Sequence, residues 1–133
     1  MDPITTDDLL RDRLSKRISA LYDDSNDLLR FSVAMDENSQ LFDNSELQAA
    51  KDESAEIAKE IEECERLLEQ YDTTRNKMSE MINKRMSFFK EWQHVLQRRP
   101  ELFERFVESQ SSIVVELETE LHKMETQIEQ RLI

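Results

Sequence analysis

Hydrophobic residues in the middle of the chain recur alternately every three and every four positions, from Leu47 to Leu96. This spacing places them on one face of an α-helix, and seven consecutive heptads exceed the three or four that normally indicate a coiled coil. We therefore predict one very long helix whose apolar face binds other helices. We call the twelve positions expected to bind partner helices the seam: Leu47, Ile57, Ile61, Cys64, Leu68, Tyr71, Arg75, Met78, Ile82, Arg85, Phe89 and Trp92.

The start of this helix is indicated by a capping box, in which Ser45 is followed three residues later by Gln48. At 1.5 Å per residue the helix is roughly 80 Å long. That length exceeds the diameter of any globule that 133 residues form. The helix is therefore expected to pair with other helices along its length.

The first 35 residues predict a shorter N-terminal helix, capped by Thr5 or Thr6. Its apolar stripe comprises Leu10, Leu14, Ile18, Leu21, Leu28 and Phe31. Asp, Asn and Ser concentrate in residues 36–45, which indicates a connector. Leu41 and Phe42 are the apolar exceptions, and we expect them to fold back onto the helices.

Pro100 interrupts the helical pattern, because proline has no backbone N–H and disfavours helical geometry at the preceding residue. We predict a turn here, with residues 46–133 forming a long helical hairpin. The stripe of the last helix runs to Leu132, which indicates a helix that continues in a longer protein or ends against a partner. Its members are Phe103, Phe106, Gln110, Ile113, Leu117, Leu121, Met124, Ile128 and Leu132.

Composition supports an all-α fold. The chain has no glycine and two prolines, whereas most tight turns of a sheet need glycine. Apolar residues make up 38% and charged residues 36%, as expected for long helices that bury a narrow stripe. The predicted fold class is an elongated helical bundle or coiled coil, with a short N-terminal helix, a very long middle helix and a third helix folded back as an antiparallel hairpin.

The charge is unevenly distributed along the chain. The net charge is −2 for residues 1–35, −9 for 36–71, +4 for 72–99 and −5 for 100–133. A hairpin turning at Pro100 sets the basic part of the middle helix beside the acidic last helix, which favours antiparallel pairing. The basic residues are Arg75, Lys77, Lys84, Arg85, Lys90, Arg98 and Arg99, and the acidic residues opposite are Glu101, Glu104, Glu108, Glu116, Glu118 and Glu120.

The overall charge also narrows the classes of partner. A net charge of −12 disfavours nucleic acid and anionic lipid. The longest apolar run is far below the ~20 residues that span a bilayer, so we expect no membrane insertion. One cysteine forms no internal disulfide, which indicates a reducing compartment, the cytoplasm or the nucleus.

Residues that suggest chemistry do not assemble into a recognisable site. Glu91 and His94 have the spacing of a di-iron motif, but the second copy and further glutamates that such a site needs are missing. Cys64 lies in the seam, where a buried small side chain is expected rather than a nucleophile. We therefore predict no catalytic residue, metal, cofactor or small-molecule substrate, and no enzyme.

Two features of the seam bear on recognition. Residues 78–92 combine Met, Phe and Trp with Lys and Arg, which is typical of a calmodulin target or an interfacial helix, but also of a wide core stripe where three helices meet. Arg75 and Arg85 interrupt the apolar seam. A charged residue at such a position weakens packing and specifies register or partner choice.

This architecture broadly resembles the helical subunits of kinetochore, spindle and vesicle-tethering complexes. In outline it is also similar to the three-helix regulatory domain that precedes a syntaxin SNARE motif. The first resemblance implies a non-catalytic scaffold or adaptor subunit that joins other helical subunits through coiled-coil pairing. The second implies a regulatory domain in membrane trafficking. Homo- and hetero-oligomers, with parallel or antiparallel helices, all fit the pattern.

Overall fold

The computed structural model describes residues 6–132, with side chains from Leu9 onward. All regular structure in this part of the chain is helical. It comprises α1 (Thr6–Glu37), α2 (Asn44–Arg98) and α3 (Pro100–Arg131), of 32, 55 and 32 residues. The predicted all-α class, with a long middle helix and a third helix folded back on it, is confirmed. The cap predicted at Thr5 lies outside the described residues, as does the side chain of Thr6.

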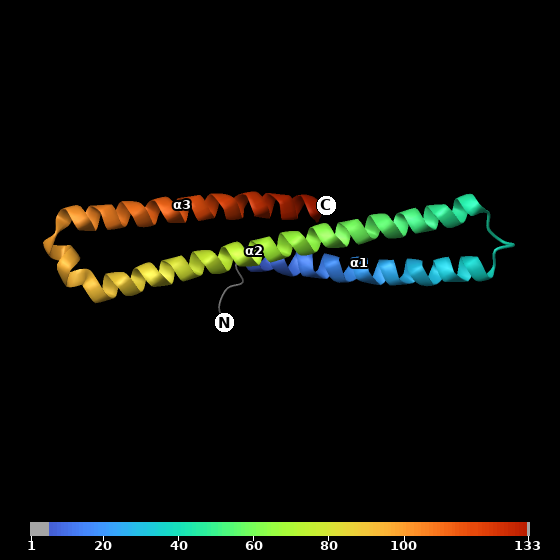
Figure 1. The fold of residues 1–133 in the computed structure, drawn as a ribbon, viewed down its shortest axis with the longest axis horizontal. Coiled ribbons are helices and arrows are strands. Elements are labelled where there is room, and N and C mark those ends of the chain that lie inside the picture. Colours follow the sequence, from blue (N-terminus) through green and yellow to red (C-terminus); the bar gives the residue numbers. More distant parts are fainter. Residues whose placement is uncertain (1–5, 133) are drawn as a thin grey trace. The chain divides into compact units, whose positions relative to one another are not determined.

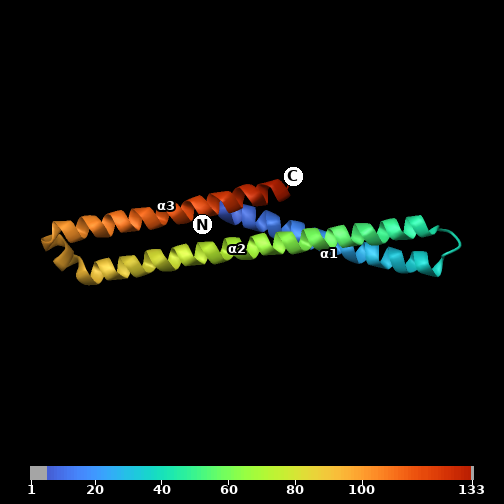
Figure 2. The ribbon, with the colours of Figure 1, turned by 45° about the horizontal axis from the view of Figure 1, so that its top comes forward.

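The helices form two compact units. The first, which we call the N-terminal unit, contains residues 6–68 and 128–132, and the second, the hairpin unit, contains Glu69–Gln127. In the N-terminal unit α1 lies antiparallel to the first part of α2, while in the hairpin unit α3 lies antiparallel to the rest of α2 (Figures 1 and 2). Helix α2 is therefore a continuous element of both units, with different neighbours in each.

The connector between α1 and α2 is shorter than predicted, because α1 continues to Glu37 and α2 begins at Asn44. Phe42 folds back as expected, and its ring meets Phe31 edge-on at 6.1 Å between centroids. Leu41 does not fold back. Its side chain remains 74% exposed, so the prediction for this residue is wrong. The connector thus contacts α1 through Phe42, while Leu41 faces solvent.

The start of α2 is capped by residues other than those predicted. The backbone N–H of Glu46 donates to the Asp43 carboxylate at 2.8 Å, and the N–H of Asp43 donates to the Glu46 carboxylate at 3.2 Å. These reciprocal bonds make a capping box of Asp43 and Glu46. Gln48, the predicted partner of Ser45, instead donates to Asp52 at 2.9 Å. The helix thus begins earlier, at Asn44.

The turn at Pro100 is confirmed. The backbone N–H of Arg99 donates to the carbonyl of Leu96, and that of Phe103 donates to the carbonyl of Arg99. Pro100 occupies the first position of α3, where its missing N–H costs no helical hydrogen bond. The hairpin is therefore closed by a single non-helical residue, Arg99, without glycine.

Burial differs between the two units. The N-terminal unit has the larger core, which comprises Leu10, Leu14, Ile18, Met35, Ala50, Ile61, Cys64, Leu67 and Ile128. In the hairpin unit the buried apolar side chains are Tyr71, Leu96, Leu117 and Leu121. The difference accompanies the make-up of the units, because the N-terminal unit brings together parts of three helices and the hairpin unit parts of two.

Candidate interaction surfaces

Most of the seam packs against other helices of its own chain. Within the N-terminal unit Ile61 and Cys64 are fully buried, and Leu47, Ile57 and Leu68 are half-buried. Leu67, which the three-four spacing omits, is also buried at 2% exposure. Where helices contact α2 on two sides, the buried stripe is wider than a coiled-coil seam. In this unit part of the seam, Ile61 and Cys64, therefore belongs to the internal core.

The seam behaves differently in the hairpin unit. Tyr71 is fully buried, but from Arg75 to Phe89 every seam position is only half-buried, and Trp92 is 44% exposed. Trp92 therefore keeps nearly half of its surface outside the contact with α3. It lies at one edge of the seam, one turn from Phe88, and the single neighbour α3 leaves that edge open. The half-buried positions are Arg75, Met78, Ile82, Arg85 and Phe89.

Aromatic side chains hold α2 and α3 together near the turn. The rings of Phe88 and Phe89 stack on Phe106, with centroids at 5.8 and 6.1 Å, and Phe89 also lies 6.3 Å from Phe103. Such pairs contribute about 0.5–1.5 kcal/mol each beyond the area that they bury. Part of the apolar stretch 78–92 is therefore hairpin core, although the core here lies between two helices and not at the predicted meeting of three.

Arg85 contributes to the same contact. Its guanidinium lies 5.0 Å from the centroid of the Phe106 ring, and its Nη2 donates to the Phe106 carbonyl oxygen at 3.2 Å. A cation over an aromatic face is favourable, and the directional hydrogen bond specifies one register of α2 against α3. Arg75 has a related position within α2, 5.6 Å from the centroid of Tyr71. In this structure Arg85 thus specifies pairing within the chain.

Two apolar faces flank the contact between α2 and α3. One is a groove of about 290 Å³, the hairpin groove, lined by Met86, Phe89, Lys90, Phe103, Phe106, Val107 and Gln110. The other carries Phe88, Trp92 and Leu102, all 44–48% exposed. Because each residue of an α-helix is rotated by about 100° from the last, Met86 and Phe88 lie on opposite sides of the seam. Monomeric proteins rarely expose so many apolar side chains together.

Basic side chains lie around both faces, and Lys90 is one that lines the hairpin groove, but the predicted ion pairs are not formed. Lys77, Lys84, Lys90, Arg98 and Arg99 make no ion pair within 4.0 Å among the described residues. The predicted antiparallel hairpin is thus correct, but ion pairs between the two helices do not hold it together. Aromatic packing and Arg85 join the helices, while these charges extend into solvent, where an exposed ion pair contributes little.

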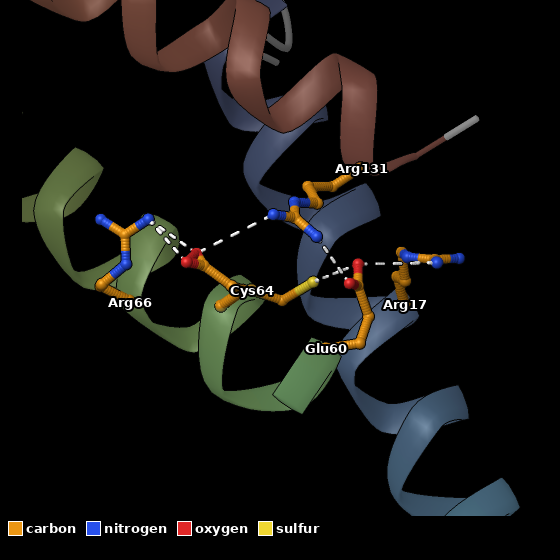
Figure 3. A network of polar contacts seen from close by, with 6 residues as sticks. Arg17, Glu60, Cys64, Arg66 and Arg131 are labelled. Atoms are coloured by element: carbon orange, nitrogen blue, oxygen red, sulfur yellow. Dashed lines mark hydrogen bonds and ion pairs between the residues drawn. The ribbon is translucent and has the colours of Figure 1, made fainter. Parts of the chain in front are cut away.

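A polar network in the N-terminal unit joins three helices (Figure 3). Arg131 of α3 donates to the Glu60 carboxylate at 2.6 Å and lies 4.0 Å from Glu63. Arg17 of α1 approaches the other oxygen of Glu60 at 3.8 Å, and Arg66 pairs with Glu63 at 2.7 Å. The last turn of α3 is therefore connected to α2 by charge-assisted hydrogen bonds.

This network influences the titration of its members. Burial, and secondarily the neighbouring Glu60 carboxylate, raises the pKa of the Cys64 thiol above its ordinary value of 9.0. The thiol itself donates to Glu60 at 3.6 Å between sulfur and oxygen. The hydrogen bond from Arg66 lowers the pKa of Glu63. Cys64 thus remains protonated near neutral pH, the opposite of an activated nucleophile.

The residues examined for metal binding do not converge. His94 stacks on Trp92 with centroids 6.3 Å apart, while His122 Nδ1 lies 4.0 Å from the Glu125 carboxylate instead of joining Glu118. Within residues 6–132 no group of three or more His, Cys, Asp and Glu side chains is arranged to hold a metal ion. Among these residues, too, no helix has the length and apolar character needed to cross a membrane.

The fold and these surfaces define a small all-α protein with one continuous helix shared between two units. The chain matches no protein-family model, no curated protein and no solved structure. The candidate surfaces therefore rest on geometry alone. Sequence reasoning missed Leu102, Val107 and the contact of Arg131 with Glu60, because these depend on which helix faces surround one another.

Proposed function

We propose that this protein is a non-catalytic helical scaffold or adaptor subunit that joins other helical proteins by helix pairing along its hairpin unit. The observation that carries this proposal is the incomplete burial of the seam between Arg75 and Trp92. In the N-terminal unit the chain's own helices bury Ile61 and Cys64 of the seam, whereas no seam position from Arg75 to Trp92 is buried to that extent. In the hairpin unit two helices leave both flanks of the contact open, and further helices complete such a core in bundles.

Buried apolar area supplies the affinity in this account. Burial contributes about 25 cal/mol per Å², and Met86, Phe88 and Trp92 retain 44–49% of their surface for a partner. Aromatic residues, methionine and arginine are the types enriched at protein interfaces. The chain's negative charge disfavours nucleic acid as the partner, and a protein helix is the natural complement of a half-covered helix face.

The test is affinity purification of the tagged full chain from cells. We expect specific helical partners to be retained by the native chain and lost with the double variant Met86→Ser, Phe88→Ser, which reduces both flanks of the hairpin. The matched control is Leu29→Ser, Val33→Ser, which removes two equally exposed apolar side chains from α1. The proposal fails if both double variants retain the same proteins, or if the native chain retains none.

A second candidate is a syntaxin-like regulatory domain from which α3 is released. The observation that favours it is the polar network, because Arg131 connects the last turn of α3 to Glu60 through partly exposed groups that exchange readily with water. Light scattering discriminates the two candidates. An extended dimer or larger assembly supports the scaffold, whereas a compact monomer whose hydrodynamic radius grows with Arg131→Glu supports the regulatory domain.

A further inference from the structure

The flank of the hairpin that carries Phe88 and Trp92 has a distinct chemical character. On α2 its positions follow three-four spacing, and they include no acidic residue. They are Met81, Lys84, Arg85, Phe88, Trp92, Val95 and Arg99. On α3 the same flank carries Leu102 and Arg105, both exposed. We call this surface the basic flank.

Geometry places these residues on one surface. Phe88 and Arg85 of α2 both contact the Phe106 ring of α3, at 5.8 and 5.0 Å, so they lie on the side of α2 that faces this ring. Trp92 follows Phe88 by one helical turn, and Leu102 precedes Phe106 by one turn. The exposed apolar side chains thus form a short row across the two helices, bordered by Lys84, Arg99 and Arg105.

Arg85 is the member of this surface that bonds within the hairpin, whereas three other basic side chains of the surface form no ion pair with a described residue. Lys84 and Arg99 are exposed and make no ion pair among the described residues, and Arg105 makes none either. Residues 84–107 contain six basic and three acidic residues, a net charge of +3 in a chain of net charge −12. A positive apolar surface on an acidic protein is a specific feature, because unneutralised positive charge attracts an acidic ligand.

We propose that the basic flank binds an acidic amphipathic helix of a partner protein. The apolar stripe of that helix covers Phe88, Trp92 and Leu102, and its carboxylates meet Lys84, Arg99 and Arg105. This inference rests on the proposed scaffold function and specifies the chemistry of the partner. A helix is favoured over a membrane because the rest of the chain is strongly acidic and is repelled by anionic lipid. Two antiparallel helices also present a groove suited to a third.

The test uses the full chain and a fluorescent synthetic peptide about five helical turns long, with leucine at three-four spacing and glutamate and alanine elsewhere. Its counterpart has lysine in place of every glutamate. We expect the acidic peptide to bind, and its affinity to fall at least roughly tenfold with Arg99→Glu, Arg105→Glu and to weaken as salt is raised. Equal or tighter binding of the lysine peptide overturns the proposal.

A matched pair of variants separates the two flanks. Phe88→Ser reduces the basic flank and Met86→Ser the hairpin groove, and the two native side chains are equally exposed, at 48% and 49%. We expect Phe88→Ser to lower the affinity for the acidic peptide at least roughly fivefold. Met86→Ser is expected to change that affinity less than roughly twofold. Circular dichroism confirms that both variants are folded. Equal loss in both variants overturns the assignment to this flank.

Other occupants give different results in the same assays. Binding to phosphatidylserine vesicles without binding to the acidic peptide overturns the proposal in favour of a lipid surface. Self-association that is lost with Arg99→Glu, Arg105→Glu, again without peptide binding, assigns the flank to a second copy of this chain. If no peptide binds, yet the affinity-purified partners are still lost with Met86→Ser, Phe88→Ser, this inference fails while the scaffold function stands.

Discussion

At the scale of single residues, burial of Ile61 and Cys64 carries the account of the N-terminal unit. Both were predicted from spacing alone, because an apolar residue on a sustained helical stripe has a strong tendency to be covered. Leu67 and Trp92 show the limit of that reasoning. Spacing specifies a direction around the helix, but the number of neighbouring helices decides whether a position is enclosed. Neighbouring helices cover Leu67, whereas Trp92 remains 44% exposed.

Ile61→Asp tests this burial directly. A carboxylate at a position that is 7% exposed loses its hydration without a partner, so we expect a loss of several kcal/mol in the free energy of unfolding. Urea denaturation followed by circular dichroism measures it. The matched control is Glu62→Lys, one residue along on the exposed side, which is expected to change stability by less than about 0.5 kcal/mol. Comparable losses in both variants contradict the assigned face.

Cys64 leads to a pH prediction. Burial raises the pKa of its thiol in the folded chain, so above the ordinary value of 9.0 the unfolded chain releases this proton more readily than the folded chain. The thiol therefore has no effect on the pH dependence of stability at neutral pH, and stability decreases as the pH rises above 9.0. Urea denaturation at pH 7 and pH 10 should show a smaller decrease for Cys64→Ala than for the native chain. Identical decreases contradict burial of an ionisable thiol.

At the scale of elements, the existence, order and approximate bounds of the helices were predictable. The absence of glycine, the three-four spacing and Pro100 each affect the conformation of the nearby backbone. They therefore predict helices and a turn without knowledge of the tertiary packing. The capping of α2 was not predicted correctly, because two overlapping boxes fit the sequence. Asp43 with Glu46 and Ser45 with Gln48 have the same spacing, and only the backbone geometry of the connector selects the first.

Removal of the Asp43 carboxylate is expected to weaken the start of α2. Asp43→Ala deletes the N-cap acceptor of the hydrogen bond from the backbone N–H of Glu46. We expect the free energy of unfolding to fall by about 1 kcal/mol. Ser45→Ala would lower stability if Ser45 and Gln48 formed the capping box. Because they do not, we expect it to change stability by less than about 0.5 kcal/mol. Thermal unfolding of the two variants compares them. A greater loss of stability for Ser45→Ala than for Asp43→Ala would show that Ser45 caps the helix, as predicted from the sequence.

At the scale of the whole molecule, the continuous helix α2 belongs to both units, and its apolar face is buried to a different degree in each. In the N-terminal unit, which contains parts of all three helices, Ile61 and Cys64 of the seam are buried, whereas in the hairpin unit the seam positions from Arg75 to Phe89 are half-buried and Trp92 is exposed. In the sequence the three-four spacing continues along the whole of α2, and this spacing does not reveal how many helices surround each turn. The difference in burial along α2, between Ile61 and Cys64 at one end and Trp92 at the other, comes from the structure.

Amide hydrogen exchange along α2 of the full chain tests this claim most directly. The account predicts slow exchange for residues 57–71, faster exchange for residues 78–92, and slowing of the second segment when the acidic peptide is added. Rapid exchange throughout residues 57–71 would show that the seam does not line a contact between helices. Equally slow exchange of residues 78–92 in the chain alone would show that the hairpin has no open side for a partner.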